Sequence, residues 1–205
     1  PLPERVLRGI VFARLANVIE GHAALSPHVA EAVAAMLDSD SLPPVPVRGQ
    51  GGAGEILSLS HLFLPLTQSV ELAEKDTLSL INGSPAATAL VADAALAARS
   101  RLELVADVFA LAAEAFNAPL GHFAEELEGL WNNPHDAWAL DALRSRIGGG
   151  HGGDRRPYQA PVSIRIMPRI LGEAHRAMEA ADTIARQSLA AVSDNPVVFP
   201  AGERI

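Results

Sequence analysis

The side chains that most often carry out chemistry are few and scattered in this sequence. There is no cysteine, which excludes disulfides, thiolate metal sites and cysteine nucleophiles. No two histidines stand four residues apart around a glutamate, so the helical zinc pattern is absent and we expect no metal site. Each histidine is most simply a surface or core residue; the seven are His22, His28, His61, His122, His135, His151 and His175.

Residues 41–54 read SLPPVPVRGQGGAG, a proline-rich stretch followed by a glycine-rich one. Proline lacks the backbone N–H and glycine carries an entropy cost, so this segment is predicted to be a loop. It lacks the Gly-Lys-Ser/Thr ending of a phosphate loop, and no Gly-x-Ser-x-Gly elbow occurs elsewhere. The loop is either an ordinary linker or a place where the backbone makes an unusual turn.

Four stretches in order carry a more specific signal. They are GGAGEILSLSH at 51–61, EKDTLSLINGS at 74–84, QAPVSIRIMPR at 159–169 and SDNP at 193–196. In the same order they resemble motifs of the histidine and phenylalanine ammonia-lyases: Gly-Ala-Ser-Gly-Asp-Leu-Ala-Pro-Leu-Ala-His, Lys-Glu-Gly-Leu-Ala-Leu-Ile-Asn-Gly-Thr, Gln-Asp-x-Tyr-Ser-x-Arg-x-x-Pro-Gln and Thr-Asp-Asn-Pro. The resemblance covers nearly the whole chain but only the middle part of the family's chain.

The resemblance implies a specific chemistry, and one residue for it is missing. These enzymes build the electrophile methylidene-imidazolone (MIO) from their own Ala-Ser-Gly, and loss of the serine hydroxyl as water makes its methylene. Without a gap, the corresponding triplet here is Gly52-Ala53-Gly54; with a one-residue gap, Ala53 is followed directly by Gly54. Neither alignment supplies a β-oxygen. We therefore expect a degenerate MIO loop and no cofactor.

Other family positions are retained. The resemblance implies that Arg165 binds the substrate carboxylate, a role that suits the planar guanidinium. It also implies that Asn82 and Gln159 line the substrate site. The alternatives are a structural salt bridge for Arg165, a turn residue before a glycine for Asn82, and a solvated loop side chain for Gln159. Tyr158 is the only tyrosine, and together with Gln159 it is our candidate for a catalytic role.

Further departures occur around these residues. Val162 stands where the family has tyrosine, Ala160 where it has aspartate and Arg169 where it has glutamine. A valine neither donates nor accepts a proton. Several such changes together indicate a site that has been reworked or has decayed.

Composition limits the possible partners. Apolar residues make up 49% and charged residues 20%, and the net charge is −8. Lys75 is the only lysine and no basic stripe occurs, so we expect no nucleic-acid partner. No run approaches ~18 uncharged apolar residues, so we expect no membrane span. The sequence begins at Pro1 without a signal-peptide pattern, and a cytoplasmic location is the default expectation.

The elements that must position these residues are predicted to be helices. Alanine is frequent and aromatic residues are only 4%, which favours an all-α fold. The longest predicted helices are Pro85–Phe116, after a Ser-Pro start, and Pro168–Ala191. We expect one all-α segment over residues 1–205, an elongated bundle of long helices like the ammonia-lyase and fumarase central bundle, with loops at 41–54 and 148–157. Shorter helices are predicted at 3–20, 27–37, 55–64, 123–131 and 137–147.

A helix of about thirty residues with apolar side chains along its length needs more partner surface than this chain supplies. We therefore expect a homo-oligomer or an assembly with another chain. The resemblance implies a tetramer, because the family bundles its central helices across four subunits.

Three functions stay open. The first is an enzyme that binds a small, amino-acid-like carboxylate and works without MIO as a lyase- or cyclase-type acid–base catalyst. The second is a non-catalytic homologue or scaffold subunit. The third is an ordinary MIO-dependent ammonia-lyase, if the protein carries a serine-derived residue that the written sequence omits. Function has to come from the site rather than from the fold.

Overall fold

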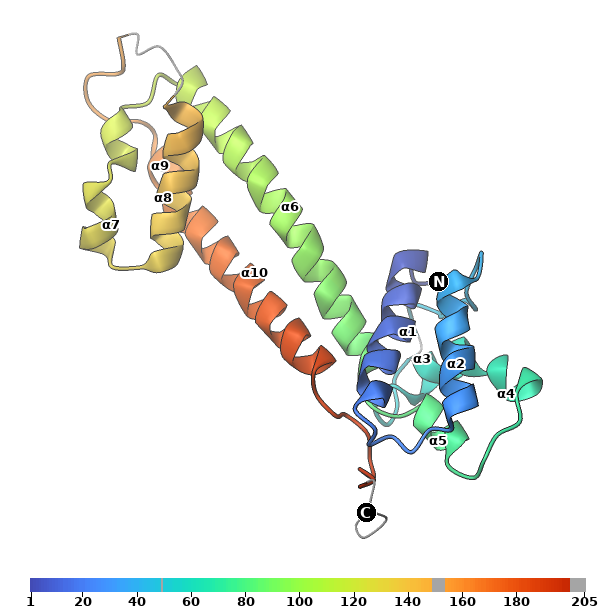
Figure 1. Ribbon diagram of the computed structural model, residues 1–205. Coiled ribbons are helices and arrows are strands. Elements are labelled where there is room, and N and C mark those ends of the chain that lie inside the picture. The colour runs from blue at the N-terminus through green and yellow to red at the C-terminus, as the bar shows by residue number, and fades with distance from the viewer. Residues whose placement is uncertain (49, 149–153, 200–205) are drawn as a thin grey trace. The chain divides into compact units, whose positions relative to one another are not determined.

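A computed structural model describes residues 1–48, 50–148 and 154–199 of the chain (Figure 1). In these ranges the ordered elements are helices and no residue lies in a strand, which confirms the all-α fold class. The elements are α1 (Glu4–Ile19), α2 (Pro27–Ala35), η1 (Met36–Asp38), α3 (Ile56–Phe63), α4 (Leu66–Ser69), α5 (Asp76–Leu80), α6 (Pro85–Ala115), η2 (Leu120–Phe123), α7 (Glu126–Trp131), α8 (Pro134–Ile147), α9 (Val162–Arg165) and α10 (Met167–Leu189).

The chain divides into two compact units. Unit 1 comprises Pro1–Ala94 and Asp182–Ile205, and unit 2 comprises Ala95–Ala181. Helices α6 and α10 each contribute residues to both units. The expectation that residues 1–205 form a single segment stays a prediction.

Unit 1 has its own hydrophobic core. Helix α1 packs against α2, and the two lie side by side in Figure 1. A Cβ on Gly9 would lie 3.2 Å from the Cβ of Ala89, so α1 approaches the start of α6 closely. Each large side chain buried in such a core stabilises the fold by about 1.5–3 kcal/mol. The largest contributors are Val6, Leu7, Ile10, Val11, Val29, Val33, Leu59, Leu62, Phe63 and Leu80.

Unit 2 has a second core, in which small residues let helices approach. Ala106, Ala110 and Ala113 of α6 are buried at steps of four and three, the spacing of one helix face. Gly172 of α10 lies against the start of α8, where an added Cβ would be 3.0 Å from the Cα of Asp136. The remaining core is aliphatic and aromatic: Leu102, Phe123, Leu140, Leu143, Ile147, Ile164, Met167, Leu171 and Met178.

The two long helices agree with the sequence to within two residues at each end. The predicted Pro85–Phe116 is Pro85–Ala115, and the predicted Pro168–Ala191 is Met167–Leu189. The predicted loops at 41–54 and 148–157 contain no helical residue among those described. Three short helices, α4, α5 and α9, were not predicted, because four or five residues are too few for a periodic pattern.

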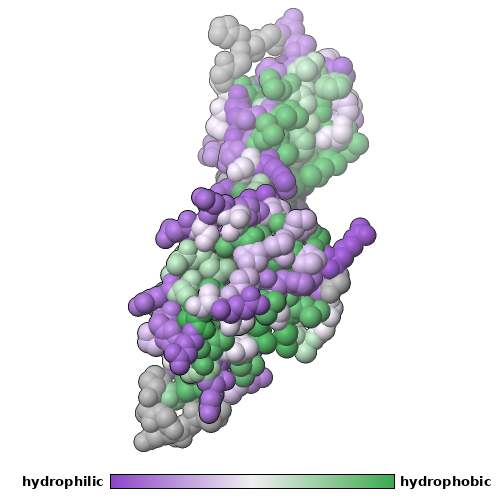
Figure 2. All heavy atoms as spheres, turned by 90° about the vertical axis from the view of Figure 1, so that its right-hand side faces the viewer, coloured by the Kyte–Doolittle hydropathy of each residue, from purple (hydrophilic) through white to green (hydrophobic). Residues whose placement is uncertain are grey.

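Exposed apolar residues occur on the long helices. The segment Asp76–Ala115 is long and apolar enough to cross a membrane by length and composition, a test that core helices of other proteins also pass. A third of its most apolar window is buried within this chain. Figure 2 shows one face of the molecule, where hydrophobic side chains (green) reach the surface between hydrophilic ones (purple). Exposed examples on α6 are Leu90, Leu96, Leu104, Val108 and Leu111.

Candidate functional site

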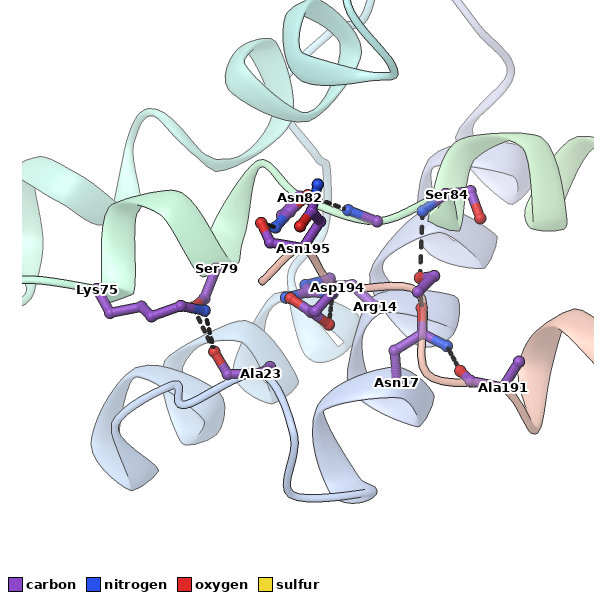
Figure 3. A network of polar contacts seen from close by, with 12 residues as sticks. Arg14, Asn17, Ala23, Lys75, Ser79, Asn82, Ser84, Ala191, Asp194 and Asn195 are labelled. Carbon is purple, nitrogen blue, oxygen red and sulfur yellow. Dashed lines mark hydrogen bonds and ion pairs between the residues drawn. The ribbon is translucent and has the colours of Figure 1, made fainter. Parts of the chain in front are cut away.

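A buried ion pair is the centre of a polar network in unit 1 (Figure 3). Arg14 of α1 donates from Nη1 and Nη2 to the two carboxylate oxygens of Asp194, at 3.0 and 2.7 Å. Both side chains are 0% exposed. Asp194 is the aspartate of the SDNP motif, so this motif secures the segment after α10 to α1.

The network continues on both sides of that pair. Asn17 of α1 donates to the backbone oxygen of Ala191 at 2.7 Å, and its side-chain oxygen accepts from Ser193 Oγ at 3.1 Å. Asn82 donates through Nδ2 to the backbone oxygen of Asn195 at 2.5 Å and accepts from the Gly83 amide at 2.9 Å. The Ile-Asn-Gly and SDNP motifs, far apart in the sequence, are therefore in direct contact.

Residues of the second motif also hold unit 1 together. Lys75 Nζ donates to the backbone oxygen of Ala23 at 2.7 Å, as does Ser79 Oγ at the same distance. Burial alone would raise the pKa of Asp76, but hydrogen bonds from the Ser26 and Ala73 amides lower it below its usual value. These charged groups are satisfied by backbone partners, which indicates a structural role.

The loop that we predict to be a degenerate MIO loop leads directly into α3. Gly52, Ala53 and Gly54 are exposed, and Gly54 has φ +58°, a left-handed conformation that suits glycine. The next residue, Glu55, reaches the start of α6: its carboxylate accepts from the amides of Ala86 and Ala87 at 2.6 and 2.7 Å. A carboxylate there satisfies free N–H groups and complements the helix dipole. MIO formation needs a serine hydroxyl that these residues lack, so they do not fit the group.

In unit 2, Arg165 lies at the end of α9 and contacts the backbone of Ala160. Its Nε donates to the backbone oxygen of Ala160 at 3.1 Å, and the Ala160 amide donates to Nε2 of His122 at 3.1 Å. The two side chains thus hold the two peptide groups on either side of the Ala160 Cα. Burial and the Arg165 charge lower the pKa of His122, which favours a neutral imidazole. None of the carboxylates in the described residues forms an ion pair with Arg165.

The proposed catalytic residues Tyr158 and Gln159 directly precede Ala160. Both are exposed, and the Tyr158 side chain is 83% accessible. Val162 is exposed at the start of α9, whereas Ala160 is buried. The exposed side chains of Tyr158 and Gln159 therefore directly precede the stretch of backbone at Ala160 that His122 and Arg165 hold in place.

Arg169 is held by two neighbours in unit 2. Its Nη1 forms an ion pair with the buried carboxylate of Asp136 at 2.5 Å. Its guanidinium carbon lies 3.9 Å from the centre of the Trp131 ring, a cation–π contact. Arginine at this position, where glutamine was expected from the resemblance, therefore connects α10 to α7 and α8.

The structure brings some of the predicted residues together. In unit 1, Asn82 contacts the SDNP motif, and the glutamate after the degenerate loop contacts the helix that follows Gly83. In unit 2, Tyr158, Gln159 and Arg165 lie along one short segment. Sequence reasoning missed His122 and Glu55 as partners, because each bonds to a backbone group distant in the sequence and carries no motif of its own.

Comparison with known proteins identifies the family. The family profile described as "Aromatic amino acid lyase" matches residues 1–69 and 67–205. The chain belongs to the aromatic amino acid lyase family. A histidine ammonia-lyase of Deinococcus radiodurans is 29% identical over 98% of the chain and 44% of the relative. A tyrosine 2,3-aminomutase of Myxococcus fulvus is 25% identical over 97% of the chain and 47% of the relative.

Structural comparison shows the same fold. The crystal structure of histidine ammonia-lyase from Trypanosoma cruzi matches with TM-score 0.85 and 23% identity, covering 100% of this chain and 43% of that one. The chain of this aromatic amino acid lyase family member thus spans less than half the length of the relatives it matches. These relatives are lyases and aminomutases, and the family normally forms MIO from its own residues.

The alignments also show a difference in length between this chain and a relative. The alignment with the Deinococcus enzyme runs over 230 positions, more than the 205 residues of this chain, so the relative has residues that this chain lacks. The two stretches matched by the family profile meet at residues 67–69. These residues lie at the end of α4.

Proposed function

We propose that this family member binds a small, amino-acid-like carboxylate at Arg165 and acts on it without MIO. The observation that supports this most directly is the state of the Arg165 side chain. It is half-buried and uses Nε on a backbone oxygen, and no carboxylate of the described residues neutralises it. A guanidinium keeps its proton in a protein, so a partly buried one favours an anionic partner.

The chemistry we propose is acid–base catalysis of the lyase or cyclase type. Tyr158 and Gln159 are the groups that touch substrate in this proposal, and the phenol is the candidate proton donor or acceptor. His122 acts as a positioning residue, because its bond to the Ala160 amide helps fix the peptide that follows Gln159. No step passes through the degenerate loop of Gly52, Ala53 and Gly54.

Asn82 has fewer hydrogen-bonding groups available for a substrate than Arg165 has. One Nδ2 hydrogen and one oxygen lone pair are already used by Asn195 and Gly83. One N–H of the amide is left for a ligand. We propose Asn82 as a secondary ligand-binding residue whose main contribution is to join two motifs of unit 1.

Binding of aromatic amino acids tests the carboxylate site. L-histidine and L-phenylalanine are titrated calorimetrically into the wild type, Arg165→Ala and the control Arg176→Ala, whose arginine pairs with Glu173 on the surface. Loss of one charge-assisted pair weakens binding by about 1.5–3 kcal/mol, roughly ten- to a hundredfold. Equal affinity for wild type and Arg165→Ala, or no binding by either, contradicts the proposal and favours a scaffold subunit.

Intact-mass measurement tests the role of MIO. We expect the mass that the written sequence gives, with no loss of water, and no absorbance band of the heterocycle. A mass that includes a dehydrated serine-derived residue contradicts the MIO-free mechanism and makes ordinary ammonia elimination the first hypothesis.

We also propose that the protein acts in the cytoplasm. We propose further that it is a homotetramer, or an assembly with another chain. The support for assembly is an exposed apolar stripe on the part of α6 in unit 2. Leu104 and Leu111 stand seven residues apart and are 62% and 69% exposed. Residues at this spacing share one helix face, and apolar faces of this kind pack on other helices. Light scattering of the wild type and of Leu104→Asp tests this: we expect an oligomer that the substitution weakens, whereas a wild-type monomer contradicts it.

A further inference from the structure

A cluster of two histidines and a glutamate lies in unit 2, on α8 and α10. His135 stands in the first turn of α8, while His175 and Glu179 stand one turn apart on α10. The two Nδ1 atoms of the histidines are 3.1 Å apart. One carboxylate oxygen of Glu179 is 3.5 Å from His135 Nδ1, and the other is 3.5 Å from His175 Nε2.

We propose that His135, His175 and Glu179 bind one transition-metal dication of the zinc class. Each residue offers a ligand atom, and the three atoms lie within 4.8 Å of one another. Tetrahedral zinc has bonds of about 2.0–2.1 Å to nitrogen, which places ligand atoms about 3.3 Å apart. The Nδ1–Nδ1 distance of 3.1 Å and the distance of 3.5 Å from His135 Nδ1 to the Glu179 carboxylate bracket that value.

The types of ligand select the metal. Two imidazoles and one carboxylate suit zinc, cobalt and nickel, whereas magnesium and calcium prefer oxygen ligands alone. Three protein ligands leave a fourth position open, the arrangement that zinc sites use to hold water or another small ligand.

The surroundings hold the two imidazoles in this geometry. The His175 ring stacks on Trp138, with centroids 3.9 Å apart and planes 7° from parallel. The amide of His135 donates to Asn133 Oδ1 at 3.0 Å, which fixes the start of α8. The side chains of His135 and His175 are 22% and 12% exposed, while that of Glu179 is 53% exposed and is free to adjust to an ion.

Without a metal, the close approach of the two histidine Nδ1 atoms restricts where the ring protons can lie. Two neutral rings whose Nδ1 atoms face each other need one of those atoms to carry the proton, because two lone pairs would repel. A dication between the rings accepts both lone pairs at once. The cluster connects α8 to α10 within unit 2, so bound metal is expected to stabilise that contact by mass action.

Metal titration of the chelator-treated protein tests the site. Zinc uptake is measured by calorimetry, and cobalt is used as a probe because its visible absorption reports four-coordinate geometry. The variants are His135→Ala, Glu179→Gln and His175→Phe, the last of which keeps a flat ring against Trp138 without a metal ligand. His28→Ala is the matched control, because His28 is exposed in unit 1 and its ring hydrogen-bonds to the backbone oxygen of Glu71.

We expect one zinc per chain, the four-coordinate cobalt spectrum, and at least about tenfold weaker binding in His135→Ala and His175→Phe. We expect His28→Ala to bind as the wild type does. Circular dichroism of each variant confirms that it is folded. Absence of zinc uptake by the folded wild type overturns the proposal. Equal affinity in wild type and folded His175→Phe also overturns it, because the ion is then held elsewhere.

Discussion

Arg14 and Asp194 stand 180 residues apart in the sequence and meet in unit 1 as an ion pair that is closed off from solvent. Two parallel hydrogen bonds fix the geometry of the pair, and the arginine Nε is the one buried side-chain nitrogen or oxygen in the described residues that lacks a partner. The SDNP motif therefore stabilises unit 1 by joining the segment after α10 to α1.

Asp194→Ala is expected to destabilise unit 1 strongly. Removal of one member of a buried ion pair leaves an uncompensated charge and typically costs about 3–5 kcal/mol. Urea denaturation measures the loss in free energy of unfolding. The control is Arg176→Ala, which breaks an exposed pair on α10 and is expected to leave the urea midpoint unchanged. Similar midpoints for Asp194→Ala and the wild type would contradict the structural role.

Gly83→Ala is expected to cost more stability than Gly21→Ala. Both glycines have nearly the same left-handed φ, +81° and +80°. A Cβ on Gly83 would lie 2.5 Å from Ser193 Oγ and 3.3 Å from Arg14 Nη1, while a Cβ on Gly21 meets nothing within 4 Å. Gly21→Ala thus reports backbone strain alone, of order 1 kcal/mol. Thermal unfolding of both variants gives the difference in stability loss. Equal losses would contradict the prediction, because the polar network around Gly83 would then have adjusted to the added Cβ without a cost in stability.

Glu55→Ala is expected to destabilise the start of α6. The carboxylate caps the amides of Ala86 and Ala87, and loss of such a cap costs about 0.5–2 kcal/mol. Glu55→Gln keeps one acceptor oxygen without the charge, so its stability should lie between that of the wild type and that of Glu55→Ala. Glu31→Ala, an exposed glutamate on α2, is the control. A Glu55→Ala protein as stable as the control would contradict the cap.

The pH dependence of stability is expected to contain a contribution from His122. Burial and the Arg165 charge lower its pKa in the folded protein below the unfolded value of about 6.5. The unfolded state therefore binds more protons in this range, and stability falls as pH drops below about 6.5 through the folded pKa. His122→Asn, which retains an acceptor for the Ala160 amide, should lose less stability between pH 7 and pH 5 than the wild type.

The control for that experiment is the same substitution at an exposed histidine of unit 1, His61→Asn. Nuclear magnetic resonance titration of the His122 ring gives the pKa directly. A value at or above that of a free histidine would contradict the prediction.

The sequence predicted the long helices because their signals are local. Ser84-Pro85 marks the start of α6, and apolar residues recur along its length at helical spacing. The contacts of the candidate site were harder to predict. The bond from Ala160 to His122 and the caps from Glu55 to α6 join groups 38, 31 and 32 residues apart, and no local pattern encodes them.

The metal cluster illustrates the same limit. His175 and Glu179 share a helix face at a spacing of four, but the third ligand, His135, comes from another helix. A search for two histidines around a glutamate cannot find such a set. The roles of Tyr158, Gln159 and Arg165, which the family resemblance suggested, stay predictions for the binding experiment.

The positions of the aromatic rings determine what optical methods report. Trp131 lies under the Arg169 guanidinium, Trp138 stacks on His175, and the single tyrosine is Tyr158. All three belong to unit 2, and unit 1 contains neither residue type. Intrinsic fluorescence during denaturation therefore follows unit 2 alone, whereas far-ultraviolet circular dichroism follows the helices of both units. Coincident curves from the two methods mean that the units unfold together, and separate curves mean that each unit has its own transition.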